Sequence, residues 1–371
     1  MQILYWLKFL FIFILVKIRP YLSSTSTSGF GKRKKFTIVE KEQVRNLKAD
    51  GFTIDASYFN GFDLNGRFLG LGMQKRPEGR CESIFFIRIP EMIQEPLVLS
   101  INPSGWTGHI IDEWKTDKGL KFDMREPMKR WKIFFDGDVV EVVSRKPHKL
   151  KFEFEWNRKS ACFDADTDMD PFVMADAIAS EKWSRSLFDN LKELHQTHYE
   201  LFGGLSGKLT LDNNPSIDWN LTSMKDRSYG KHRFWGDFRR YILHYIATED
   251  GLYIGCHFVS ITKTFTHLTV GFVMNSKGEK FVVTKSTHQL WDIGEKELPL
   301  TYPYSFQITD NHGNKYDINI RVVEKIKFFC GPIRDGTLYS SYVLGTVNGV
   351  KASGLCEYEY NSDIYSYLLN E

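Results

Sequence analysis

The chain of 371 residues contains few cysteines and carries little net charge. No two of its five cysteines form a Cys-x-x-Cys pair, and their number is odd. This argues against a zinc site and against a disulfide framework, and it predicts reduced, buried thiols. The net charge is only +3, and the Lys32–Lys35 cluster supplies much of it. We therefore expect no nucleic-acid partner.

Motifs for nucleotides, metals and common hydrolases are also missing. The glycines of Gly61–Met73 do not have the spacing of a phosphate-binding loop that opens a helix. No GxSxG, HExxH or Walker sequence is present. The acidic run Asp164–Asp170 resembles the start of a calcium loop, but Met169 and Ala175 replace the required Gly and Glu. We expect neither a cofactor nor a metal.

The N-terminus contains the one long apolar run, Ile3–Ile18. A helix that spans a membrane needs about 20 residues, so this short run is at the lower edge of the required length. We expect a membrane anchor over residues 1–19. A cleaved signal peptide and a buried core helix are the alternatives. Basic residues follow the run, which predicts that the bulk of the chain is cytoplasmic. Residues 20–35 are expected to form a flexible basic linker.

The rest of the chain has the pattern of a mainly β protein. Aromatic residues make up 15% of the sequence, and Lys149–Trp156 alternates apolar and charged side chains. A hairpin turn is expected at Asp136-Gly137, and helical spacing marks Glu181–His195. From Gly203 onward, short strands alternate with Gly and Asn turns. We predict two tandem β-barrel-like domains, residues 36–202 and 203–371, with an amphipathic helix near their junction.

The stretch Trp219–Tyr245 is rich in cations and aromatic rings, and it contains the first candidate site. Asp226 and His244 are the candidate catalytic residues, since an acid and a His among aromatics in a barrel interior could protonate an apolar molecule. If residues 234–245 form one strand, His244 and Trp235 lie on opposite faces. A structural cluster of ion pairs and rings is the alternative interpretation.

Other candidate residues lie outside this stretch. His198 and Glu200 precede Gly203-Gly204 at the expected domain junction, where ligand sites often occur, although a hinge is an alternative. Glu357 lies on the expected last strand, where it could face inward or face water.

Several of these motifs together resemble those of a known family. They are His198-Tyr-Glu200, Gly203, Asp226-x-Ser-Tyr-Gly230 with Arg233 and Trp235, and Glu126-Pro-Met-Lys-Arg-Trp131. Over residues 40–371 the chain resembles the lipocalin-like double-domain family of carotenoid 1,2-hydratases and AttH-like proteins. The nearest look-alikes are animal proteins labelled phosphoenolpyruvate synthase-like, but this chain lacks the phosphotransfer domain behind that label.

The resemblance implies two calycin-like barrels in tandem. Hydratases of this kind add water to an isoprenoid double bond without a cofactor, with an acidic residue as proton donor. Asp226 matches that position, whereas Arg227 replaces a usual His. Tyr229, Arg233, Trp235, His198, Glu200 and Glu357 are the candidate ligand-binding residues.

Three functions remain open at this point. The first is a membrane-tethered protein that binds a lipid or isoprenoid. The second is a cofactor-free hydratase, isomerase or cyclase, and the third is a structural protein with a vestigial site. The sequence does not indicate an oligomeric state.

Overall fold

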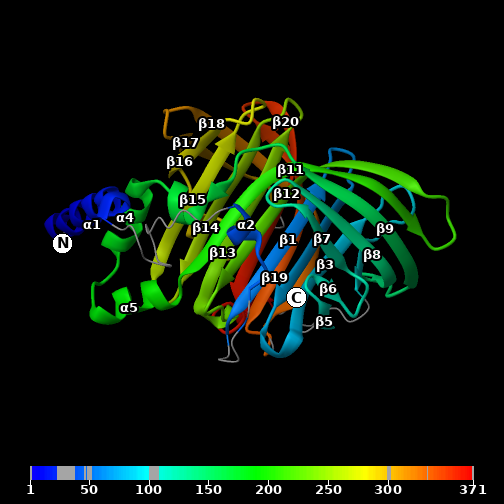
Figure 1. Ribbon diagram of the computed structural model, residues 1–371. Coiled ribbons are helices and arrows are strands. Elements are labelled where there is room, and N and C mark those ends of the chain that lie inside the picture. The colour runs from blue at the N-terminus through cyan, green and yellow to red at the C-terminus, as the bar shows by residue number, and fades with distance from the viewer. Residues whose placement is uncertain are drawn as a thin grey trace.

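Two antiparallel β-barrels lie side by side in the computed structural model (Figure 1). The structure describes residues 2–22, 38–45, 47, 52–99, 108–298, 302–331 and 333–369. Most of the predicted linker, including the Lys32–Lys35 cluster, lies outside the described residues. The predicted fold class, mainly β with two β-barrels in tandem, is confirmed.

Eight strands close the first barrel, because β11 pairs with both β12 and β9. These strands are β1 (Ile54–Phe62), β2 (Phe68–Lys75), β3 (Arg80–Arg88), β4 (Leu97–Leu99), β8 (Arg130–Glu141), β9 (Pro147–Arg158), β11 (Gln196–Leu211) and β12 (Ile217–Gly230). Four short strands extend this sheet: β5 (Gly108–Asp112), β6 (Lys115–Thr116), β7 (Lys121–Glu126) and β10 (Phe163–Asp164).

The first barrel therefore continues to Gly230, and the predicted boundary between residues 202 and 203 falls inside β11. A hinge was the alternative interpretation of this junction, but Gly203 has a packing role in the structure. A Cβ atom at this position would lie 2.6 Å from the carbonyl oxygen of Asn157 and 2.6 Å from the ring of Trp156. The glycine allows β11 to approach β9 closely.

The second barrel is closed by eight consecutive strands. They are β13 (Phe238–Thr248), β14 (Tyr253–Ile261), β15 (Phe265–Met274), β16 (Lys280–Ser286), β17 (Tyr304–Asp310), β18 (Lys315–Cys330), β19 (Gly336–Val347) and β20 (Val350–Asn361). The predicted strand over residues 234–245 starts only at Phe238, because the 3₁₀ turn η2 (Trp235–Asp237) precedes it.

The predicted hairpin turn at Asp136-Gly137 is wrong, since β8 runs straight through both residues. The turn lies earlier, between β7 and β8, where Met128 adopts a positive φ of 60°. Gly137 is needed for a different reason. A Cβ atom there would come within 2.9 Å of the carbonyl oxygen of Lys118, so the glycine permits a close approach of two backbones.

Side chains fill the interiors of both barrels. The first interior contains Phe59, Trp131 and Trp156 among many aliphatic residues, and the second contains Phe258, Phe306 and Tyr358. Barrels of eight strands have interiors just wide enough for side chains to fill.

Helices cover one end of the second barrel (Figure 1). The longest is α1 (Gln2–Leu22), which packs on α4 (Pro171–Ser180), while α5 (Arg185–Glu193) falls within the predicted helical stretch. The other described helices and 3₁₀ turns of the protein are short: α2 (Ile38–Glu42), α3 (Ala165–Asp168), α6 (Ser366–Leu369), η1 (Pro77–Gly79) and η3 (Leu290–Asp292). Among the described helices, none combines the length and the apolar character needed to cross a membrane.

Candidate functional site

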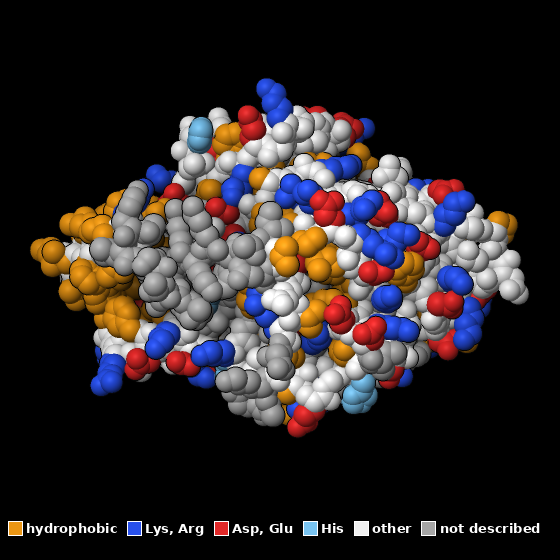
Figure 2. Space-filling view, in the orientation of Figure 1, with side chains coloured by type: hydrophobic (Ala, Val, Ile, Leu, Met, Phe, Trp, Pro, Cys, Tyr) orange, Lys and Arg blue, Asp and Glu red, His pale blue; other side chains and the backbone are white. Residues whose placement is uncertain are grey.

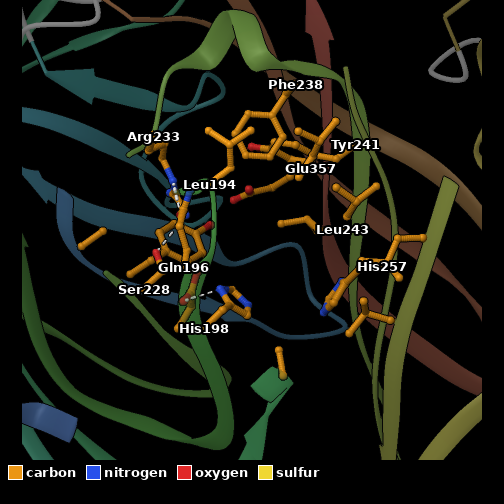
Figure 3. Close-up of a pocket in the computed structure, with 18 of the residues that line it drawn as sticks. Leu194, Gln196, His198, Ser228, Arg233, Phe238, Tyr241, Leu243, His257 and Glu357 are labelled. Atoms are coloured by element: carbon orange, nitrogen blue, oxygen red, sulfur yellow. Dashed lines mark hydrogen bonds and ion pairs between the residues drawn. The ribbon is translucent and has the colours of Figure 1, made fainter. Parts of the chain in front are cut away.

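A cavity of about 240 Å³ lies between the two barrels, not inside either of them. Strands β1, β2, β11 and β12 line it from the first barrel, and β13, β14, β15 and β20 line it from the second. Helix α5 contributes Leu191 at one side. Most of the lining is apolar, and Figure 3 shows the polar groups of His198, Arg233, His257 and Glu357 around the same space.

Strand alternation explains which side chains reach this cavity. On β12, Asp226 and Ser228 point out of the first barrel, whereas Lys225 and Arg227 point into it. On β13 the order changes at an irregularity between Phe238 and Arg240. After it, the odd-numbered residues of β13 face the cavity. A bulge of this kind re-aims the side chains that follow it.

Glu200 is the centre of a buried hydrogen-bond network that joins the two barrels. Its Oε1 atom lies 2.8 Å from Nε2 of His198 and accepts a hydrogen bond from the Tyr245 hydroxyl at 3.2 Å. Its Oε2 atom lies 2.9 Å from Nε2 of His257. Burial acts to raise the pKa of Glu200, but His257 and His198 outweigh it and hold the pKa well below its ordinary range.

His198 connects this network to Asp226. Its Nδ1 atom lies 3.4 Å from Oδ1 of Asp226, and the register places Asp226 directly opposite Glu200 on the neighbouring strand. Burial acts to lower the pKa of His198, but the two carboxyls outweigh it and raise the pKa to about 9. A protonated imidazole therefore separates two carboxyl groups that would otherwise repel each other.

The cavity also contains two carboxyls with raised pKa values. Burial raises the pKa of Asp226, and the charge of His198 only partly offsets this rise. Burial raises the pKa of Glu357 to about 7, with an opposing contribution from the Tyr58 hydroxyl and a further rise from Asp226. Glu357 takes part in no ion pair among the described residues. A carboxyl that is half protonated near neutral pH can donate a proton.

Arg233 and Trp235 lie at the cavity and are held in place by side chains of the first barrel. Arg233 donates to Oε1 of Gln196 at 2.7 Å and to the Ser228 hydroxyl at 3.1 Å. The indole of Trp235 donates to Oε2 of Glu82 at 2.9 Å. Both side chains are thus fixed before any ligand binds.

The structure does not bring His244 and Tyr229 to this cavity. His244 lies inside the second barrel, 2.9 Å from the Tyr304 hydroxyl and 2.9 Å from the Cys256 carbonyl oxygen. Burial lowers the pKa of His244 to about 3. The ring of Tyr229 packs under the guanidinium of Arg45, against the core of the first barrel. The catalytic role of His244 and the ligand-binding role of Tyr229 stay predictions, and both side chains lie away from the cavity.

The cations next to Asp226 in the sequence are paired inside the first barrel. Lys225 lies 2.9 Å from Oε1 of Glu42, and both side chains are fully buried. Arg227 forms an ion pair with Asp55 and donates to the Ala56 carbonyl oxygen at 2.8 Å. These ion pairs match the structural alternative considered for this stretch, whereas Asp226 itself faces the cavity.

Sequence reasoning missed the aromatic and imidazole groups of the facing strands. His257, Tyr241 and Tyr245 come from the second barrel, and Tyr58 comes from β1. His257 follows Cys256 in an expected strand, so alternation places the two on opposite faces. In the sequence, a polar ring on the outer face of an otherwise apolar strand was the signal that could have identified His257.

Comparison with known proteins places the chain in a family. A family model matches residues 2–360. The chain belongs to a family of unknown function, DUF8627. A search with the sequence found no significant match among curated proteins.

Several solved structures are similar to this member of the family. An AttH-like protein from Nitrosomonas europaea has 12% identity and a TM-score of 0.48, over 84% of this chain and 93% of that chain. Kievitone hydratase from Nectria haematococca has 11% identity and a TM-score of 0.47, over 91% and 97%. CghA, in a structure with Sch210972, has 8% identity and a TM-score of 0.45, over 84% and 88%.

AttH-like proteins were among the relatives that the sequence motifs predicted. The predicted likeness to animal proteins labelled phosphoenolpyruvate synthase-like stays a prediction. Within the part of the chain that the structure describes, no cluster of three or more His, Cys, Asp or Glu side chains is arranged to hold a metal ion.

Proposed function

We propose that the cavity between the barrels binds an apolar small molecule and transfers a proton to it without a cofactor. The observation that carries this proposal is a mostly apolar cavity with the buried carboxyl of Glu357, whose pKa of about 7 suits a proton donor at neutral pH. Acid-catalysed hydration, isomerisation and cyclisation of an unsaturated molecule all begin with such a transfer.

In this proposal the acid and the base are different carboxyls. Glu357 donates its proton to one carbon of a double bond, and Asp226, oriented by His198, accepts the proton that is lost in the next step. In a hydration, that second proton comes from the water that attacks the other carbon. Exchange with solvent then removes the proton from Asp226 and returns one to Glu357. The sequence had indicated Asp226 as the donor. We assign it the role of base because protonated His198 lies 3.4 Å away and partly offsets the rise that burial causes in the pKa of Asp226.

The first experiment tests whether the protein carries a bound apolar ligand. Purification from the native host, followed by organic extraction and mass spectrometry, should yield a bound apolar molecule in about equal molar amount. A preparation that carries no such molecule, and takes up none from a lipid extract, would contradict the proposal.

Catalysis is tested with the identified ligand and three variants. Glu357→Gln and Asp226→Asn should each lower turnover by about 100-fold or more while the ligand still binds, since general acid–base catalysis contributes roughly that much. Glu359→Gln is the matched control. Glu359 is fully buried two residues further along β20 but does not line the cavity. Unchanged turnover in the first two variants would refute the assigned roles.

A binding function without catalysis is the second candidate. The network of His198, Glu200 and His257 favours it, because the Glu200 carboxylate already bonds to both imidazoles without a ligand. Binding of the ligand with no conversion by the wild type would support this candidate. A structural role with a vestigial site would instead predict that neither binding nor conversion is found. The membrane location and the cytoplasmic placement of the bulk of the chain stay predictions.

A further inference from the structure

Helix α1 presents a wide apolar face to the outside of the molecule. Nine large apolar side chains on it are exposed: Ile3, Leu4, Trp6, Leu7, Leu10, Phe11, Ile14, Leu15 and Ile18. Six of these are each more than half exposed: Ile3 at 79%, Leu4 at 60%, Trp6 at 53%, Leu7 at 62%, Leu10 at 54% and Phe11 at 55%. Figure 2 shows the hydrophobic side chains gathered at the end of the molecule where Figure 1 places α1. Contiguous apolar surfaces of this kind mark interaction sites.

The opposite face of α1 is fixed to the rest of the protein. Phe9 and Ile12 are buried, and the Phe9 ring contacts the ring of Phe172 at the start of α4. Tyr5 donates a hydrogen bond to Asp176. The helix is therefore held against α4 along one side, and its exposed side chains lie on the other.

The one charge within the first two-thirds of α1 does not interrupt the exposed face. Lys8 turns toward the end of α4, where it donates to the carbonyl oxygen of Glu181 at 2.6 Å. Cations are favoured there, at the negative end of the helix dipole. The outer face from Ile3 to Leu15 is consequently free of charge.

The charge that follows this face is of one sign. The first 39 residues contain Lys8, Lys17, Arg19, Lys32, Arg33, Lys34 and Lys35 but no Asp or Glu. A second copy that docked through α1 would bring two such basic segments together, which is repulsive. Anionic lipid headgroups complement the charge, and an apolar helix face next to a basic segment provides the two signals needed for stable membrane attachment.

An apolar path leads from this face to the cavity. The ring of Phe11 contacts Trp183 at 5.9 Å between centroids, and Trp183 contacts Phe188 of α5 at 5.3 Å. Phe188 is 40% exposed, and Leu191, one turn further along α5, lines the cavity. The buried core under α1 is continuous with the side chains around the cavity, including Leu268 and Tyr241.

We propose that α1 and the start of α5 form a membrane-docking surface, with α1 lying in the plane of an anionic lipid bilayer and its outer face among the acyl chains. The docked surface would place α5, and with it one wall of the cavity, next to the lipid. Attachment does not depend on the reaction in the cavity.

The test is flotation of the full-length chain with lipid vesicles. The wild type should float with phosphatidylcholine vesicles that contain phosphatidylserine, and less with pure phosphatidylcholine. Leu7→Glu/Ile14→Glu, which places two charges on the outer face, should lower the bound fraction at least tenfold. Val143→Glu/Ile333→Glu is the control, because these two side chains are as exposed, at 79% and 74%, but lie elsewhere.

Four outcomes would overturn the proposal. The first is a wild type that stays unbound in both vesicle types, and the second is a control variant that loses binding as strongly as the α1 variant. The third is a wild-type dimer that the Leu7→Glu/Ile14→Glu variant does not form, with no vesicle binding, which would identify a second copy as the occupant. The intact mass of the native protein checks that α1 is retained. A mature chain without residues 2–22 would also refute the proposal.

Discussion

Glu357 should make the protein less stable as the pH rises, and Glu357→Gln should remove this effect. The side chain is 7% exposed and takes part in no ion pair among the described residues. Its pKa rises from an ordinary value of 4.5 in the unfolded chain to about 7 in the folded protein. The folded state thus holds the proton more tightly, so the free energy of unfolding falls as the pH increases from 4.5 to 7.

The magnitude follows from the two pKa values. Each pKa unit corresponds to about 1.4 kcal/mol, so ionised Glu357 costs the folded state about 3 kcal/mol at pH 8 and less than about 1 kcal/mol at pH 5. Gln is nearly isosteric with the neutral acid and does not titrate. We expect Glu357→Gln to be more stable than the wild type by about 3 kcal/mol at pH 8 and nearly equal to it at pH 5.

Urea denaturation of both proteins at pH 5, 6, 7 and 8 measures this difference. The wild type and Glu357→Gln share all other titrating groups, so the contributions of those groups to the free energy of unfolding cancel in the comparison. Glu249→Gln, at an exposed position, is the control, and its free energy of unfolding should stay close to that of the wild type at all four pH values. The reasoning fails if the stability difference stays constant between pH 5 and 8, or if Glu357→Gln is the less stable protein at pH 8.

Two further predictions concern other buried charges. His198→Gln should lower the free energy of unfolding by about 2–3 kcal/mol at pH 6, because the pKa of His198 rises from 6.5 to about 9 next to Asp226 and Glu200. The stabilising effect of protonated His198 is complete below pH 6.5 and is lost as the pH rises through 9. Wild-type and variant stabilities that still differ at pH 10 would contradict this prediction. Lys225→Met should cost about 3–5 kcal/mol, because it leaves the Glu42 carboxylate buried without a partner, whereas Lys225→Met/Glu42→Gln should cost clearly less. In a double-mutant cycle that includes Glu42→Gln, a loss in the double variant equal to the sum of the two single losses would show that the pair is not coupled.

Strand alternation allowed much of the fold and part of the site to be predicted from the sequence. Alternation is a local property, so it can be read from the sequence of Lys149–Trp156. In the structure, the apolar residues of this segment are buried on one side of β9. The same alternation places Asp226 on the face opposite to its two cationic neighbours. Among the candidates, Asp226, His198, Arg233, Trp235 and Glu357 lie around one cavity.

The remaining features depend on contacts between distant parts of the chain. The pairing of β11 with β9 joins residues about 50 positions apart, and no local pattern indicates that it closes the first barrel. The irregularity near Arg240 changes which side of β13 faces outward, and it separates His244 from the cavity. The fixed period of two that the sequence suggested for residues 234–245 cannot include a bulge.

The position of the site explains why its polar groups must also hold the protein together. Large side chains fill both barrel interiors, and the candidate site lies where the outer faces of the barrels meet. Those outer faces are joined there through Glu200, which comes from the first barrel and contacts Tyr245 and His257 of the second. A shift of one barrel against the other would leave the Glu200 carboxylate buried with fewer partners, which costs several kcal/mol. The same network that orders His198 beside Asp226 therefore sets the relative position of the two walls of the cavity.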